Sequence, residues 1–137
     1  MAILAGIDLL GKFYAGDDSG RGNPQKGVGA RFKSFTEKYL IQSKTDAETL
    51  YQLRNSLLHS FGLYSKTSKG EYRFILTRGS RQFITNTNEG QYVIDVSILW
   101  NKFEEGIESY FQELYQVHEL QKKFEMMFGN YGVARIG

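Results

Sequence analysis

The residues best suited to chemistry lie close together in the stretch LRNSLLHSFG, residues 53–62. Arg54 and Asn55 are followed at position 59 by one of only two histidines in the chain. On a helix, Asn55 and His59 are four residues apart and share a face. Arg54 lies about 100° around the axis, with a side chain long enough to reach the same side. We therefore expect the three side chains to line the rim of one groove.

Together these side chains could act on a phosphate group. An imidazole exchanges a proton near neutral pH. A guanidinium binds two phosphate oxygens and stabilises the charge that grows on them during attack. A neighbouring amide can fix the orientation of the imidazole. Such a set is sufficient to cleave RNA through its own 2′-hydroxyl without a metal ion. The alternative is a helical arginine and histidine that share no task.

Other candidate sites are weaker. The stretch GIDLLGK, residues 6–12, nearly matches a phosphate-binding P-loop, but Phe13 stands where Ser or Thr is required and no strand precedes it. His59 and His118 have no second histidine at helical spacing, so we predict no metal site and no cofactor. The acidic residues late in the chain suit the solvated face of a helix: Glu104, Glu105 and Glu108.

Three helices are predicted around the motif. Apolar residues recur at helical spacing over residues 2–14 and 28–43, with a glycine-rich loop between them. TDAE, residues 45–48, has the form of a capping box and should begin a third helix that ends at Gly62. The residues expected on the buried faces are Ile3, Ile7, Leu10, Tyr14, Val28, Phe32, Phe35, Tyr39, Leu40, Leu50, Leu53, Leu57 and Phe61.

Beyond residue 70 the spacing of apolar residues changes from the helical pattern to the alternating pattern of strands. EYRFILTR, RQFITNT and QYVIDV alternate apolar and polar residues, which predicts two or three short antiparallel strands. From Ser97 the helical period returns and runs to Gly129 and Gly132, through Trp100, Phe103, Ile107, Phe111, Leu114 and Phe124. We therefore predict a mainly α fold: a four-helix bundle with a short antiparallel β-meander inserted before the long last helix.

Composition bounds the class of protein. The chain has 137 residues, 41% of them hydrophobic, which suits a single domain over residues 1–137 with its own core. It contains no cysteine, which excludes disulfides, cysteine metal sites and thiol nucleophiles. The first residues form neither a basic leader nor a membrane-spanning run, so we expect a cytoplasmic protein.

Charge is distributed unevenly along the chain. Residues 1–81 contain 13 Lys/Arg against 7 Asp/Glu, whereas residues 82–137 contain 4 against 8. A basic first half suits an anionic ligand such as RNA. Basic residues after the motif could follow a phosphate backbone while two tyrosines stack bases: Lys66, Lys69, Arg73, Arg78, Arg81, Tyr64 and Tyr72. The simpler interpretation is that these are the solvated charges of a hairpin.

The motif RNSLLH, residues 54–59, resembles the signature of the HEPN superfamily: Arg, a polar residue that is often Asn, and then His on one helix. HEPN proteins are compact helical bundles, and many are metal-independent ribonucleases in toxin–antitoxin, abortive-infection or CRISPR defence systems. The resemblance implies that Arg54 and His59 are catalytic and that Asn55 supports them. In one toxin branch an antitoxin nucleotidylates a Tyr two residues after the His. Phe61 occupies that position here, which argues against this form of control, although Tyr64 is close.

A homodimer is expected on chemical grounds. One histidine cannot stand on both sides of the phosphorus, whereas two chains related by a two-fold axis supply two histidines and two arginines. HEPN proteins, which the chain resembles, pair through the motif helix. Aromatic residues offer apolar surface for the contact, although packing in the core is the more common use of each: Phe61, Trp100 and Phe103.

Two main functions remain open. The first is an endoribonuclease with RNA as substrate and, in a toxin–antitoxin system, an antitoxin protein as partner. The second is a non-catalytic HEPN-like module that binds a nucleotide, an RNA or a protein. A plain structural or assembly subunit is the third interpretation, and the geometry of the site must decide among them.

Overall fold

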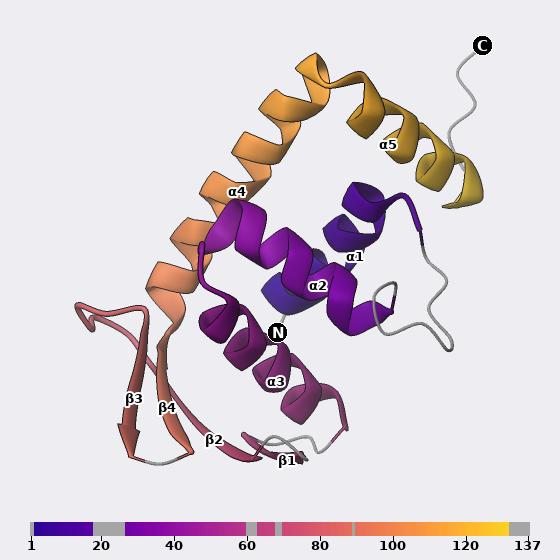
Figure 1. Ribbon diagram of the computed structural model, residues 1–137. Helices are drawn as coiled ribbons and strands as arrows, with labels where there is room; N and C mark the ends of the chain where they lie inside the picture. Colours follow the sequence, from indigo (N-terminus) through magenta and orange to yellow (C-terminus); the bar gives the residue numbers. More distant parts are fainter. Residues whose placement is uncertain (1, 18–26, 60–62, 68–69, 89, 132–137) are drawn as a thin grey trace.

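The computed structural model describes residues 2–17, 27–59, 63–67, 70–88 and 90–131. Its helical segments are α1 (Ala2–Ala15), α2 (Val28–Phe35), the π-helical η1 (Thr36–Leu40), α3 (Lys44–His59), α4 (Val96–Gln116) and α5 (His118–Tyr131). One sheet contains the strands β1 (Tyr64–Thr67), β2 (Gly70–Thr77), β3 (Ile84–Asn88) and β4 (Gln91–Asp95). The chain is mainly helical with a small sheet before its last helices, as predicted (Figure 1).

The apolar stripes predicted for the first three helices meet in one hydrophobic core. The buried members are Ile3, Ile7, Phe32, Phe35, Leu40, Leu50 and Leu53. Leu10, Tyr14, Tyr39 and Leu57 are partly buried and pack against them. Val28, at the start of α2, is instead 37% exposed. Residues Phe61 and Gly62, predicted to end the third helix, lie outside the described residues.

The buried face of α4 differs from the predicted one by about one residue. Leu99, Gly106 and Tyr110 are buried, whereas Trp100 and Phe111 are 50% and 39% exposed. A glycine on the buried face explains the difference, because Gly106 carries no apolar side chain and so gives no hydrophobic signal. Its role is to let α4 approach η1 closely: a Cβ atom there would lie 2.9 Å from the carbonyl oxygen of Tyr39.

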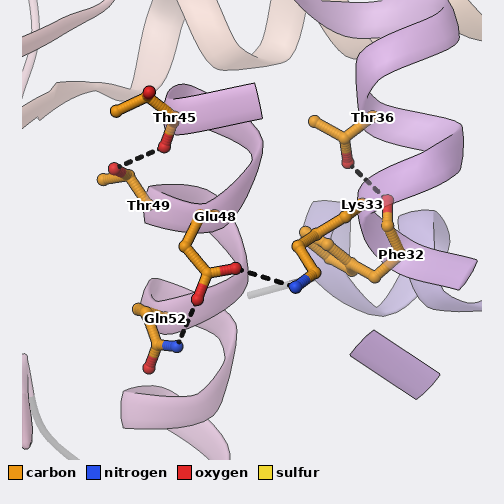
Figure 2. A network of polar contacts seen from close by, with 7 residues as sticks. All are labelled: Phe32, Lys33, Thr36, Thr45, Glu48, Thr49 and Gln52. Atoms are coloured by element: carbon orange, nitrogen blue, oxygen red, sulfur yellow. Dashed lines mark hydrogen bonds and ion pairs between the residues drawn. The ribbon is translucent and has the colours of Figure 1, made fainter. Parts of the chain in front are cut away.

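The start of α3 corrects the predicted capping box. Ser43 Oγ accepts a hydrogen bond from the backbone N–H of Asp46 at 3.2 Å, which places the N-cap two residues before Thr45. Thr45 therefore lies inside α3, where its carbonyl accepts from Thr49 Oγ1 at 3.0 Å (Figure 2). The error arose because both Ser43 and Thr45 are good capping residues, and spacing alone does not choose between them.

Glu48 has a tertiary role in the structure. Its carboxylate accepts from Lys33 Nζ on α2 at 2.9 Å and from Gln52 Nε2, one turn further along α3, at 3.1 Å (Figure 2). Both the lysine and the glutamate side chains are partly shielded from solvent. This bridge holds α3 beside α2 and so helps to set the rotation of the helix that carries Arg54.

The predicted antiparallel meander is wrong. The strand order is β1-β2-β4-β3, and β2 pairs with β4 in parallel, with Phe74 opposite Tyr92. The composition of the strands explains this order. β4 contains the fully buried Ile94 and takes a central position, whereas the Thr- and Asn-rich β3, ITNTN, forms an edge. The four-residue β1 was not predicted, because YSKT is too short and polar to give a strand signal.

The predicted long last helix is also wrong, because it is broken at Val117. This residue adopts an extended conformation with φ −104° and ψ 109°, and α5 turns back to lie beside α1 (Figure 1). Gln121 Nε2 donates to the carbonyls of Leu114 and Tyr115 at 2.9 and 3.1 Å, which satisfies acceptors at the end of α4. Phe124 then packs on Phe13, with ring centroids 4.9 Å apart.

The end of α5 differs from the prediction as well. The helix continues past Gly129 to Tyr131, while Gly132 lies outside the described residues. The structure therefore has five α-helices and η1 in its described part, where the sequence predicted four helices.

Replacing Gly106 with Ala should lower the free energy of unfolding by about 1–3 kcal/mol, because the added methyl group would meet the backbone of η1. The gain in helix propensity, up to about 1 kcal/mol, is too small to offset this clash. Gly129→Ala is the matched control, since nothing lies within 4 Å of a Cβ atom there. Urea denaturation of both variants measures the difference; equal stabilities would show that α4 and η1 are not in close contact.

Candidate functional site

Arg54 is held by side chains from two helices. Its Nε donates to Asp8 Oδ2 on α1 at 2.9 Å, and its Nη1 donates to Asn55 Oδ1 at 2.8 Å. The guanidinium also lies over the ring of Tyr51, with Cζ 5.7 Å from the ring centroid. The pair predicted as a catalytic arginine and its supporting amide is thus in direct contact.

The rotation of α3 puts Arg54 at this position. Leu50 and Leu53 are fully buried on the core side of the helix, so the next residue after Leu53 lies at the edge of the apolar face. The Arg54 side chain is 15% exposed, and that of Asp8 is 19% exposed. Arg54 and Asn55 are both of intermediate exposure, and the arginine is more enclosed than a surface residue. Their predicted position at the rim of a shared groove stays a prediction.

The guanidinium keeps hydrogen-bonding capacity for a ligand. Arginine has five N–H donors, and the contacts to Asp8 and Asn55 use two of them. Within the described part of the chain, both Nη2 protons and the second Nη1 proton have no partner. Asp8 Oδ1 is likewise buried without a hydrogen-bond partner among those residues. A ligand at this position would therefore meet both free donors and a free acceptor.

The pocket beside Arg54 is small and apolar. It has a volume of about 50 Å³ and is lined by Leu4, Ala5, Asp8, Arg54, Leu57 and Leu58. This is room for a few atoms of a ligand, such as the oxygens of one phosphate, but not for a nucleotide. Any larger substrate must lie across its mouth, where Leu58 is 53% exposed.

His59 is the last residue of α3, and its side chain lies outside the described part of the structure. From Arg54 to His59 the helix rises roughly 7.5 Å, a little over one turn. The backbone therefore places His59 near the same end of α3 as Arg54. The contact between their side chains stays a prediction.

The predicted RNA-binding residues separate into two groups. Tyr64 and Lys66 on β1 lie on the same face of the sheet as Arg73 on β2, because Tyr64 is the cross-strand partner of Arg73. The Arg73 guanidinium lies over the Tyr64 ring, with Cζ 5.6 Å from the centroid. Arg78 and Arg81 lie beyond the other end of β2, in the connection to β3, while Lys69 is outside the described residues.

Two aromatic predictions require correction. Tyr72 is only 9% exposed and stacks on Tyr92, with centroids 5.3 Å apart, so it cannot stack a base. Burial also raises the pKa of its hydroxyl group. Phe103, predicted to offer surface for a dimer, packs against the core next to Gly6. Trp100 does remain exposed, whereas Phe61 lies outside the described residues.

Sequence reasoning missed Asp8 and Tyr51 as neighbours of Arg54. A signal for Asp8 was available, because it is a carboxylate within the otherwise apolar stretch AILAGIDLL. A charged residue so close to a buried helix face requires a partner of opposite charge. No spacing rule could have identified that partner, since Arg54 is 46 residues away.

Comparisons with known proteins gave no match: no family model, no curated protein and no solved structure corresponds significantly to this chain. Within the part of the chain that the structure describes, no helix is long and apolar enough to cross a membrane. Among the same residues, no group of three or more His, Asp or Glu side chains is arranged so that it could hold a metal ion.

The Asp8–Arg54 pair should contribute measurably to stability. In a double-mutant cycle with Asp8→Asn and Arg54→Gln, we expect a coupling of about 1–2 kcal/mol, because both side chains are largely shielded from solvent. The control is Lys38–Glu113, whose nitrogen and oxygen are 3.7 Å apart and whose side chains are 50% and 41% exposed. That pair should couple by less than about 1 kcal/mol. Equal couplings in the two cycles would contradict a shielded ion pair at Arg54.

Proposed function

We propose that the chain is a metal-independent endoribonuclease of HEPN type that cleaves RNA through the 2′-hydroxyl. One observation carries this proposal: the guanidinium of Arg54 is fixed by Asp8, Asn55 and Tyr51 while three of its N–H donors stay unused by the described residues. It lies on the helix that ends with the only histidine of the motif. Unused N–H donors that are already held in position can stabilise the negative charge that develops on phosphate oxygens in the transition state.

The proposed reaction needs one proton acceptor and one donor. The base removes the proton of the 2′-hydroxyl, whose oxygen attacks the adjacent phosphorus. The bond from phosphorus to the 5′-oxygen then breaks, and that oxygen takes a proton from the acid. The products are a 2′,3′-cyclic phosphate and a 5′-hydroxyl. His59 would transfer the protons, since imidazole is suited to both roles near neutral pH.

Asp8 bears on how Arg54 would act. A carboxylate 2.9 Å from Nε compensates much of the positive charge of the guanidinium. Arg54 would therefore bind a phosphate more weakly than an isolated arginine. Its donors are nevertheless held in one orientation, so little reorganisation is needed as charge develops on the phosphate oxygens. We infer that Arg54 contributes more to the transition state than to binding of the substrate.

The same charge compensation favours the second candidate function. A HEPN-like module that binds a nucleotide, an RNA or a protein without cleaving it would tolerate an arginine committed to an ion pair. The two functions differ in whether the motif transfers a proton. Cleavage products and the effect of His59 therefore distinguish them.

The rest of the proposal concerns the setting of the enzyme. RNA would be the substrate, and the face formed by Tyr64, Lys66 and Arg73 would contact its backbone and bases. A toxin–antitoxin or phage-defence role in the cytoplasm, with an antitoxin protein as partner, follows from the HEPN resemblance of the motif.

The protein should cleave single-stranded RNA in the presence of excess chelator and leave 2′,3′-cyclic or 3′-phosphate ends with 5′-hydroxyls. His59→Ala should slow cleavage by about 10²–10⁴-fold through loss of proton transfer. Arg54→Ala should cost roughly 2–4 kcal/mol of transition-state stabilisation. His118→Ala is the matched control, since this histidine begins α5 and is exposed. Wild-type rates in folded His59→Ala and Arg54→Ala would leave only the binding module.

The proposed mechanism also requires two copies of the chain. A two-fold pairing through α3 would place two histidines and two arginines around one phosphate and would cover the exposed Leu58. Light scattering at micromolar concentration should report twice the chain mass, and His59→Ala chains mixed with wild type should reduce activity beyond simple dilution. Leu58→Glu should give monomers with little activity.

The control for this substitution is Tyr115→Glu. Tyr115 is 86% exposed near the end of α4, and we expect its replacement to leave the dimer intact. A Leu58→Glu chain that is monomeric and fully active would contradict the shared site.

A further inference from the structure

A second, larger groove is lined in part by a residue of the first turn of α1. It has a volume of about 530 Å³ and is lined by Ile3, Arg78, Val96, Ser97, Trp100 and Asn101. Ile3 lines this groove, while the next residue, Leu4, lines the pocket of Arg54. The first turn of α1 therefore contributes one residue to the wall of each concavity. Only the larger one falls within the usual range for small-molecule sites, roughly 300–1,000 Å³.

The groove combines an aromatic platform with a cation. Trp100 is 50% exposed although it lies on a helix that packs against the core. Arg78 is exposed at the end of β2 and has no ion-pair partner among the residues that the structure describes. Ser97 and Asn101 add a hydroxyl and an amide beside the indole. A base stacked on a tryptophan, with its phosphate on an arginine, is the usual way in which single strands are bound.

Asp95 holds the two walls of the groove together. Its Oδ1 accepts from the backbone N–H of Ile98 in the first turn of α4 at 2.9 Å. Its Oδ2 accepts from the backbone N–H of Ser80, in the turn that follows Arg78, at 2.6 Å. The hydrogen bond from Ile98, and then that from Ser80, lowers the pKa of this carboxyl group below its usual value. Both oxygens thus bond to the protein, and the turn with Arg78 is tied to the helix with Trp100.

We propose that the groove of Trp100, Arg78 and Asn101 is a nucleotide subsite that binds one base and one phosphate of a single-stranded RNA. The proposal rests on the proposed ribonuclease function and extends it, because the pocket of Arg54 is too small to hold a nucleotide. A second copy of the chain is a poorer occupant. Tryptophan and arginine also occur often in protein interfaces, but such interfaces are broad, whereas this groove is a single concavity whose volume lies within the usual range for small-molecule sites. Its wall also adds the polar side chains of Ser97 and Asn101, which can bond to a base.

The single tryptophan of the chain gives a direct readout of this groove. The probe is a short single-stranded 2′-O-methyl oligoribonucleotide, which lacks the attacking hydroxyl and cannot be cleaved by the proposed reaction. We expect it to quench the fluorescence of Trp100 in a saturable manner. Binding measured independently, by anisotropy of a labelled oligonucleotide, should weaken by roughly 5- to 100-fold in Trp100→Ala. Trp100→Phe, which keeps an aromatic ring, should retain most of the affinity.

Arg78→Gln and Arg81→Gln form a matched pair. Both arginines are exposed in the connection from β2 to β3, but only Arg78 lines the groove. Arg78→Gln should weaken binding and lower the slope of log affinity against log salt concentration by about 0.7, the value for one phosphate contact on a single strand. Arg81→Gln should leave the quenching unchanged. Thermal melting verifies that each variant is folded.

The subsite would be overturned by no binding of the probe, by binding without quenching, or by unchanged affinity in both Trp100→Ala and Arg78→Gln. Quenching that depends on protein concentration without the probe would assign the groove to a second copy of the chain and would also overturn it. Failure of the ribonuclease proposal is distinguishable, because it appears as cleavage that is absent or indifferent to His59→Ala. The fluorescence of Trp100 does not depend on that result.

Discussion

The ion pair between Asp8 and Arg54 is the constraint on which the candidate site depends. Removing two charges from water costs free energy, and a pair that is mostly enclosed recovers it only when its geometry is good. The 2.9 Å contact between Nε and Oδ2 meets that condition, and Asn55 and Tyr51 complete the surroundings of the guanidinium. The pair joins α1 to α3, so the position of Arg54 is set by how these helices pack.

An aromatic cluster joins α1, the helix that carries Asp8, to the neighbouring helices. Tyr14, Phe35, Tyr39 and Tyr110 come from α1, α2, η1 and α4, with centroid separations from 4.9 to 6.4 Å. Burial raises the pKa of Tyr110 to about 12, and its hydroxyl oxygen has no hydrogen-bond partner among the described residues. Tyr39 instead donates to Glu113 at 2.9 Å. Because these rings are closely packed and leave little free space, the helices that carry them are held in one arrangement.

The local elements could be predicted from the sequence, whereas the tertiary pairings could not. Apolar spacing located α1, α2 and α3 because a helix that buries one face must repeat every three to four residues. The break at Val117 escaped detection because the apolar period continues through it without a Gly or Pro. The parallel pairing of β2 and β4 depends on which strand is buried most, a property of the whole sheet. Arg54 and Asn55 could be identified from their spacing on one helix. Asp8 could not, because it contacts Arg54 from a different helix.

Under the proposed ribonuclease function, the sizes of the two concavities would divide substrate binding from chemistry. The pocket of Arg54 holds about 50 Å³ and presents donors whose charge Asp8 largely compensates, so it gains little from an intact phosphodiester. The groove of Trp100 and Arg78 is about ten times larger and offers stacking and an unpaired cation, which favour a ground-state ligand. Binding energy from the groove of Trp100 and Arg78 can then position the reacting phosphate against the N–H donors of Arg54. Those donors stabilise the phosphate mainly in the transition state, when its negative charge increases. The first turn of α1, with Ile3 facing one concavity and Leu4 the other, is where these two contributions would be joined.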